Sequence, residues 1–249
     1  MKITFLGTGH GLHEKGRYRT SMMLEVGGST YLIDAGSPVM HQLINSDRAL
    51  KEIRAVFITH THNDHMMNVL EMVDAISCTK TDASIDFYIP EQNAIDAIKQ
   101  YLMVTSGILN EQDARMHTYD ESFVYEDENI KLTPFKTGHL AKKGRPSFGY
   151  VLEAEGKRVI FSGDLSYLLE MNDFPKVAKT LESDLFICEM AHFDFEFLRE
   201  HIKECKTKTV AFNHIKFPNE RIPLLKKENE SGEFAFPLFA PDDYDVIEL

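Results

Sequence analysis

The chain has 249 residues, 43% of them hydrophobic, which is enough for a substantial core within a single large α/β domain. Its formal net charge is −12, from 39 acidic and 27 basic residues, and this disfavours non-specific binding to nucleic acid or to anionic membranes. No apolar run approaches the roughly 18 residues of a membrane span, so we expect no membrane-spanning segment.

Apolar β-branched runs and helical patterns alternate along the whole chain. Strands are expected over residues 2–6, 20–26, 30–34, 54–59, 85–89, 130–137, 147–154, 158–162, 184–188, 208–213 and 244–248. Helices are expected over residues 38–49, 64–77, 91–105, 174–182, 193–204 and 218–226. Glycine-centred turns at 26–29 and 155–157 predict two β-hairpins.

This order of elements predicts one domain over residues 1–249. Strands first form a meander and then alternate with helices, and the cycle occurs twice with no linker between the two halves. Residues 92–128 are the hardest to read, because a helical pattern runs into an acidic loop, and they are a natural place for an insertion.

The amino terminus and the cysteines bear on the cellular compartment. Residues 1–9 form a short apolar run that ends in glycine, without the long hydrophobic stretch of a secretory signal. The three cysteines, Cys78, Cys188 and Cys205, have no paired spacing. We therefore expect a reduced, cytoplasmic protein.

The run from His60 to His65 directly follows the expected strand 54–59. If the backbone stays extended to residue 62, His60 and His62 point to the same side, and two imidazoles so placed suit one metal ion. Asp64 and His65 follow where the chain turns into a helix, and they face away from the first pair. This arrangement favours a second metal site beside the first.

Three further metal-competent residues also follow apolar runs, namely His139, Asp164 and His214. A single histidine or aspartate at a strand end is commonly a hydrogen-bonded turn residue. Four separate strand ends of this kind, however, would place their side chains at one edge of a sheet, where a rigid scaffold presents ligands to a cleft.

Over nearly its full length the sequence resembles the metallo-β-lactamase-fold superfamily. Residues 32–36 resemble the first motif, residues 60–65 match the second, and His139, Asp164 and His214 match the third, fourth and fifth. The resemblance implies a four-layer αββα sandwich with a metal site at one edge of its two sheets, and a structural role for Asp34 without metal binding. It also implies two metal sites, one of His60, His62 and His139 and the other of Asp64, His65 and His214, bridged by Asp164.

Two features narrow the resemblance within the superfamily. The best-known β-lactamases of this fold have cysteine where this chain has Asp164, so antibiotic hydrolysis is not the expected role. Residues 5–9 and 19–21 resemble the opening of the ribonuclease Z-like phosphodiesterase branch.

Residues 184–192 also resemble that branch, but with departures. In ribonuclease Z this stretch carries a His-Glu-Ala-Thr signature whose histidine assists phosphodiester cleavage. Glu189 matches the glutamate, whereas Cys188 takes the place of the histidine and Met190 breaks the pattern. His192 is either the missing proton donor or a polar residue at a helix start. These departures, the net charge of −12 and the lack of a Gly/Pro-rich arm disfavour transfer RNA processing.

The expected function is that of a dinuclear-metal-dependent hydrolase, in which a metal-bridging hydroxide attacks an anionic phosphodiester or a related small ester. Asp64 would orient this hydroxide and accept its proton, and His192 is the second catalytic candidate. Histidine and carboxylate ligands suit two Zn²⁺ ions, although Mn²⁺ or Fe²⁺ is compatible. The basic residues at 142–145, just after His139, favour a small anionic substrate.

Two other functions fit the same metal-ligand set. One is a lactonase or thioesterase-type hydrolase, and the other is a catalytically inactive metal-binding scaffold protein. By analogy with the ribonuclease Z-like branch, we also expect a homodimer.

Overall fold

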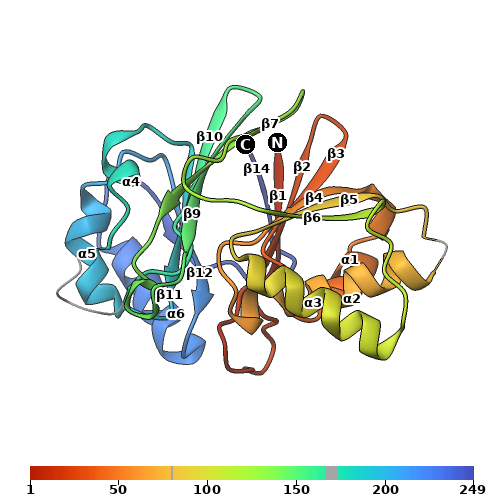
Figure 1. The fold of residues 1–249 in the computed structure, drawn as a ribbon. Helices are drawn as coiled ribbons and strands as arrows, with labels where there is room; N and C mark the ends of the chain where they lie inside the picture. Colours follow the sequence, from red (N-terminus) through yellow and green to blue (C-terminus); the bar gives the residue numbers. More distant parts are fainter. Residues whose placement is uncertain (80, 167–172) are drawn as a thin grey trace.

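The computed structural model describes residues 1–79, 81–166 and 173–249. Two seven-stranded sheets lie face to face, and helices cover the outer side of each sheet (Figure 1). The layers therefore run helix, sheet, sheet, helix, which confirms the predicted αββα sandwich. No helix in the described ranges has both the length and the apolar character that crossing a membrane would take.

The first sheet comes from the amino-terminal half and the last strand, in the order β14-β1-β2-β3-β4-β5-β6. Its strands are β1 (Lys2–Gly7), β2 (Ser21–Val26), β3 (Ser29–Ile33), β4 (Ile53–Phe57), β5 (Ile85–Ile89), β6 (Ala114–Thr118) and β14 (Val246–Glu248). Pairing is antiparallel from β14 to β3 and parallel from β3 to β6. The connections between the parallel strands contain α1 (Val39–Asn45), a 3-10 turn (Leu50–Glu52), α2 (Asn63–Cys78) and α3 (Gln92–Thr105).

The second sheet repeats this plan in the order β13-β12-β11-β10-β9-β8-β7. Its strands are β7 (Tyr125–Glu126), β8 (Lys131–Lys136), β9 (Phe148–Ala154), β10 (Lys157–Phe161), β11 (Leu185–Met190), β12 (Val210–Ile215) and β13 (Leu238–Phe239). Antiparallel pairing from β7 to β10 gives way to parallel pairing from β10 to β13. The helices of this half are α4 (Lys176–Thr180), α5 (Phe195–Lys203) and α6 (Pro218–Glu230), with a 3-10 turn at Ala141–Lys143.

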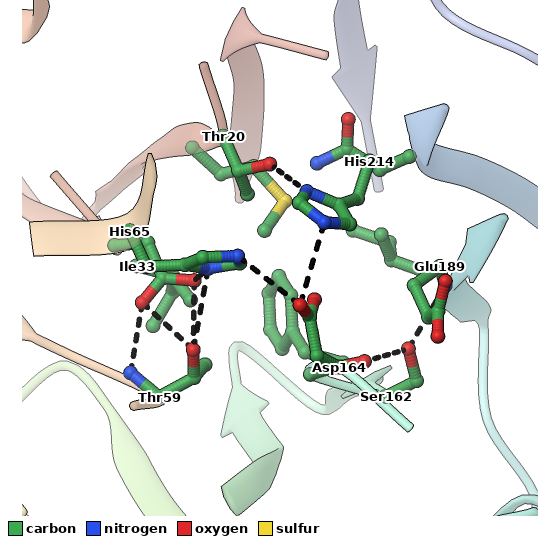
Figure 2. A pocket seen from close by; sticks show the side chains of 14 residues that line it. Thr20, Ile33, Thr59, His65, Ser162, Asp164, Glu189 and His214 are labelled. Carbon is green, nitrogen blue, oxygen red and sulfur yellow. Dashed lines mark hydrogen bonds and ion pairs between the residues drawn. The ribbon is translucent and has the colours of Figure 1, made fainter. Parts of the chain in front are cut away.

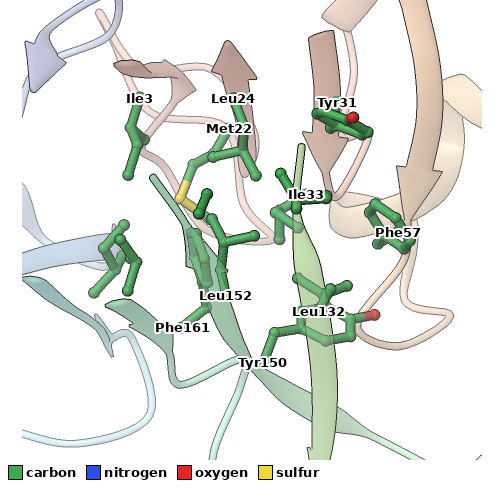
Figure 3. Close-up of a cluster of buried hydrophobic side chains, with 14 of the residues drawn as sticks. Ile3, Met22, Leu24, Tyr31, Ile33, Phe57, Leu132, Tyr150, Leu152 and Phe161 are labelled. Carbon is green, nitrogen blue, oxygen red and sulfur yellow. The ribbon is translucent and has the colours of Figure 1, made fainter. Parts of the chain in front are cut away.

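Alternating side chains along the strands build three apolar layers. In β2, Met22 and Leu24 pack between the sheets, whereas Met23 packs under the first group of helices. Both faces of such a strand are buried, because helices cover one side and the other sheet covers the second. Figure 3 shows the central layer, where Met22 and Leu24 of the first sheet point toward Leu152 and Phe161 of the second. Each buried side chain of this size contributes roughly 1.5–3 kcal/mol to stability.

All eleven expected strands and all six expected helices occur close to their predicted positions. The main difference lies in residues 92–128, which were expected to be an insertion. There α3 is followed by β6, which pairs in parallel with β5 and completes the first sheet. Only Ala114 of β6 is fully buried, so the strand lacks the apolar run that would identify it in the sequence.

Candidate metal centre

Polar side chains gather at one edge of the sandwich, at the carboxyl-terminal ends of strands β4, β8, β10 and β12. His60 lies three residues after β4, His139 three residues after β8 and Asp164 three residues after β10. His214 is the last residue but one of β12. Because strands that run in the same direction end at the same edge of a sheet, these loops meet there.

The structure brings together all seven residues that the sequence predicts as metal ligands. Within each of three groups, one potential ligand atom per residue lies within 4.8 Å of the others. The groups are His60, His62 and His139; His60, His65 and Asp164; and Asp64, His65 and His214. We call the first of these groups the first metal site and the last the second metal site, and Asp164 lies between them.

Asp164 is the centre of this cluster. Four histidine nitrogens surround its Oδ2 atom, at 3.3 Å (His214 Nε2), 3.4 Å (His65 Nε2), 3.7 Å (His60 Nε2) and 3.7 Å (His139 Nε2). Figure 2 shows Asp164 between His65 and His214, beside a small internal cavity of about 30 Å³. A carboxylate in this position can bridge two cations.

The other ring nitrogen of these histidines is held by an acceptor. His65 Nδ1 donates to Asp34 Oδ2 at 2.7 Å, and His139 Nδ1 donates to the Leu165 carbonyl at 3.2 Å. The Thr20 hydroxyl donates to the Gly9 carbonyl at 2.9 Å and accepts from His214 Nδ1 at 2.6 Å. Acceptors at Nδ1 fix the tautomer and turn Nε2 toward the centre, as in histidines that ligate metals.

Two buried nitrogens at the centre indicate that a cation fits there. His60 Nε2 and His65 Nε2 are inaccessible to solvent, and neither has a hydrogen-bond partner among the described residues. Burial lowers the pKa of His60 well below its usual value and that of His62 to about 4. Both imidazoles are therefore neutral at pH 7, which metal binding requires.

His65 differs because three carboxylates surround it. Burial alone would lower its pKa, but the charges of Asp164, Asp34 and Asp64 outweigh burial and raise the pKa well above its usual value. Without metal, His65 therefore keeps a proton that compensates these carboxylates. A divalent cation in the same place would replace that proton and supply the positive charge.

Asp34 supports the site from behind, in the structural role that the resemblance implies. Its carboxylate is 2% exposed and accepts from His65 Nδ1, from the Thr59 backbone N–H at 2.8 Å and from the Thr59 hydroxyl. It belongs to none of the ligand groups formed by the described residues. Asp34 thus ties the strand end before His60 to the ring of His65.

With this geometry established, comparison with known proteins defines the family. The family model described as anti-Pycsar protein Apyc1 matches residues 1–224. The chain belongs to the anti-Pycsar protein Apyc1 family. A ribonuclease Z from Gloeothece citriformis is 30% identical over 154 residues, which are 60% of this chain and 46% of that protein. The chain thus spans about half the length of the curated relatives that it matches.

Solved structures show the same fold in other proteins. The metallo-β-lactamase fold protein YhfI from Bacillus subtilis has a TM-score of 0.75 at 18% identity, covering 99% of both chains. The short form of human tRNase Z has a TM-score of 0.73 at 20% identity, covering 100% of this chain and 99% of that one. This Apyc1-family chain therefore has the metallo-β-lactamase fold, as predicted, and its sequence is similar to that of ribonuclease Z.

The structure of this Apyc1-family chain separates Cys188 from Glu189 and His192. Side chains alternate along β11, so Cys188 points into the apolar layer under α5, where it is fully buried, and Glu189 points toward the metal centre. Glu189 Oε1 lies 2.9 Å from His192 Nδ1, and His192 Nδ1 lies 3.9 Å from Asp164 Oδ2. His192 also forms a further ligand-type group with His139 and Asp164.

His192 therefore lies at the centre and differs chemically from the predicted ligands. Burial lowers its pKa, but the hydrogen bond with Glu189 and the charge of Asp164 outweigh burial and raise the pKa to about 9. The imidazole is thus protonated at neutral pH in the metal-free protein. Cys188 lies on the opposite face of β11 from this centre, and burial raises the pKa of its thiol well above the usual value.

The basic residues at 142–145, which were expected to favour an anionic substrate, do not share one environment. Lys142 and Lys143 are exposed, but Arg145 forms a two-point ion pair with Glu91, in which Nε lies 2.9 Å from Oε1 and Nη2 lies 2.7 Å from Oε2. Arg145 and Glu91 both also hydrogen-bond to the Thr61 hydroxyl. Arg145 thus joins the His139 loop to the strand end between His60 and His62, and Glu91 neutralises its charge.

Sequence reasoning did not find Glu91, Thr20 or Asp173, all of which hold parts of the centre in place. Glu91 follows the end of β5, so a polar residue after a strand was available as a signal. Thr20 and Asp173 lie in no motif and show no spacing that distinguishes them from loop residues.

Proposed function

We propose that this chain is a hydrolase that uses two metal ions to cleave a small anionic phosphodiester. The observation that carries the proposal is the convergence of four histidine nitrogens on Asp164 Oδ2, two of them buried without a hydrogen bond. One ion would be held by His60, His62 and His139. The other would be held by Asp64, His65 and His214, and Asp164 would be a ligand of both. Histidine with carboxylate suits Zn²⁺, and Mn²⁺ or Fe²⁺ is compatible.

The chain's own residues define how a substrate would approach. His60, His65 and Asp164 are buried, whereas His62 and Asp64 are partly exposed, so the substrate enters from their side. When bound, two such ions would lower the pKa of a water toward roughly 7 and stabilise negative charge on a phosphoryl oxygen. The free carboxylate oxygen of Asp64 would accept the proton of the attacking water, and His192 would donate a proton to the leaving oxygen.

Charge favours a small substrate over a nucleic acid. The chain carries a net charge of −12, and Arg145, which follows the His139 loop, is neutralised by Glu91. A polymer contact would need clustered, unpaired Lys and Arg that follow successive phosphates. A small diester needs only the metal ions and the single charge of His192.

The first experiment combines metal analysis with hydrolysis of bis(p-nitrophenyl) phosphate. The protein, loaded in turn with Zn²⁺, Mn²⁺ or Fe²⁺, is expected to bind two ions and to release p-nitrophenol. The matched control is His60→Ala, which removes a proposed ligand and should abolish turnover. Hydrolysis of a lactone panel without any turnover of the diester would contradict the substrate class. No turnover of any ester by the doubly loaded protein would favour the inactive scaffold.

His192→Asn is expected to lower kcat on a diester with an alcohol leaving group, whose oxygen needs a proton to depart, by roughly 10²–10⁴-fold, the usual range for loss of a general acid, while the metal content stays at two. His192 is in its acid form below its pKa of about 9, and ions at Asp164 would lower that value. The wild-type rate should therefore fall as the pH rises toward 9, and the variant should lack this fall.

The control for this change is His117→Asn, which removes another histidine paired with a carboxylate. His117, on the edge strand β6, has its Nε2 atom 2.8 Å from Asp86 Oδ1 on β5, and neither residue belongs to the metal centre. This variant should keep the wild-type pH profile. If the rate of His192→Asn still falls toward pH 9 as the wild-type rate does, His192 is excluded as the proton donor.

The homodimer and the cytoplasmic location remain proposals. The end of α3 exposes apolar side chains, with Tyr101 55%, Met103 56% and Val104 80% exposed, and this supports a contact between two copies. Light scattering of the purified protein should then give twice the mass of one chain. A monomer at micromolar concentration would contradict this proposal.

A further inference from the structure

The Asp173 carboxylate connects two of the loops that build the metal centre. Its Oδ1 and Oδ2 atoms both lie 2.7 Å from the Gly138 backbone nitrogen, and Oδ2 also lies 2.7 Å from the Ser166 backbone nitrogen. Gly138 immediately precedes His139, and Ser166 is two residues beyond Asp164. One side chain thus accepts hydrogen bonds from both loops.

We propose that Asp173 is a positioning residue that sets the affinity of the first metal site by fixing the loops of His139 and Asp164. The inference rests on the proposed function, because it assumes that these residues bind metal. Asp173 does not reach the cluster itself, and it appears in none of the ligand groups formed by the described residues. Its effect would therefore pass through the backbone of the two loops.

Further hydrogen bonds tie the same two loops to each other. His139 Nδ1 donates to the Leu165 carbonyl at 3.2 Å, so the ring orientation of His139 depends on where residue 165 lies. The Leu165 N–H donates to Glu189 Oε1 at 3.1 Å. The loop after Asp164 is thus held by Glu189 on one side and by Asp173 on the other.

The environment of Asp173 indicates that these backbone contacts are its main interaction. Among residues 1–79, 81–166 and 173–249, no lysine, arginine or histidine forms a salt bridge with it. Burial raises its pKa, although the hydrogen bonds from Ser166 and Gly138 act in the opposite direction. A partly buried carboxylate without a cationic partner destabilises the fold, and here two N–H groups offset that cost.

The second metal site depends on other supports. Asp34 holds His65, and Thr20 holds His214, and in the part of the chain that the structure describes no hydrogen bond or ion pair joins either residue to Asp173. The first site takes both His139 and Asp164 from the loops that Asp173 fixes, whereas the second shares only Asp164, so loss of Asp173 should weaken the first site more than the second. A carboxylate that merely stabilises a loop would not discriminate between them.

The test is a two-step Zn²⁺ titration by calorimetry, with a competing chelator, on the full chain. Asp173→Ala is expected to weaken the first site by about 10–100-fold, the usual effect of removing a support behind a ligand, and to weaken the second site less. His139→Ala and His214→Ala identify which step belongs to which site. Asp173→Asn keeps one acceptor oxygen and should fall between wild type and Asp173→Ala, so the test also holds if the alanine variant does not fold.

The matched control is Asp184→Ala. Asp184 also accepts a backbone N–H, from Arg158 at 3.0 Å, but it precedes β11 and so lies at the end of that strand opposite the metal centre. Unchanged affinity of the first site in both Asp173 variants, or equal weakening of both sites, would overturn this inference but leave the proposed function standing. A wild-type protein that does not take up two ions would overturn the proposed function as well.

Discussion

Asp164→Asn is expected to lower kcat/KM for bis(p-nitrophenyl) phosphate by about 10³-fold, which corresponds to roughly 4 kcal/mol of lost transition-state stabilisation. The reason lies in the position of Oδ2, which four histidine nitrogens surround at 3.3 to 3.7 Å. An asparagine fills the same space, but it carries no charge and cannot bridge two cations. Both proposed sites would therefore lose a ligand at once.

The electrostatics of Asp164 lead to the same expectation. Burial raises the pKa of its carboxyl, but His214 and His65 outweigh burial and hold the pKa well below its usual range, so the group is ionised at neutral pH. Without this charge, Asp64 would be the one carboxylate left among the proposed ligands of two divalent ions. Elemental analysis should therefore show fewer than two ions in Asp164→Asn.

Asp184→Asn is the control for the chemical change, because it makes the same substitution beyond the reach of the metal centre. It should retain two ions and the wild-type kcat/KM. Two tightly bound ions in Asp164→Asn, with kcat/KM within tenfold of wild type, would remove Asp164 from the proposed bridging position.

The residues that form the His/Asp cluster could be found from the sequence because they follow strand ends, although metal binding by this cluster stays a prediction. Buried strands of a sandwich read as continuous apolar runs, and a histidine or aspartate just beyond such a run stands out. His60, His139 and Asp164 were found in this way, and each lies three residues after its strand. The hairpin turns at 26–29 and 155–157 could be predicted as well, because a glycine between two apolar runs indicates a turn that needs a left-handed backbone conformation.

What the sequence did not predict depends on contacts between distant segments. Arg145 belongs to the basic run that was expected to favour an anionic substrate, yet it pairs with Glu91, 54 residues away in the chain. The register of β11 decides that Glu189 faces the centre and Cys188 does not, and a shift of one residue would reverse this. Such pairings leave no periodic pattern, because they are settled by tertiary packing.

Asp34→Ala is expected to lower the free energy of unfolding by roughly 3–5 kcal/mol, since several buried donors lose their acceptor together. Asp34 Oδ2 accepts from His65 Nδ1 at 2.7 Å, and Oδ1 accepts from the Thr59 N–H at 2.8 Å and from the Thr59 hydroxyl at 3.0 Å. Alanine would leave these groups unpaired among side chains that exclude water. The backbone adds to the cost, because Asp34 has φ 62° and alanine adopts this left-handed conformation poorly.

Asp34→Asn distinguishes the cost of the left-handed backbone conformation from the cost of losing the hydrogen-bond acceptor. Asparagine tolerates the left-handed conformation and keeps one oxygen for Thr59, but its amide nitrogen cannot accept from His65. We expect urea unfolding of the metal-free protein to show a loss of about 1–2 kcal/mol in this variant. Its second metal site should bind Zn²⁺ about 10–100-fold more weakly, since His65 loses the acceptor that orients its ring.

The two variants together test whether Asp34 acts through His65. A loss below about 1 kcal/mol in Asp34→Ala would show that water reaches Thr59 and His65 once the carboxylate is gone, contrary to their burial. Normal Zn²⁺ affinity in Asp34→Asn would show that packing alone orients His65. The expected outcome is that Asp34→Ala lowers both stability and the Zn²⁺ affinity of the second site, whereas Asp34→Asn lowers mainly the affinity. This result would show that one carboxylate both stabilises the strand end before His60 and orients His65 for metal binding.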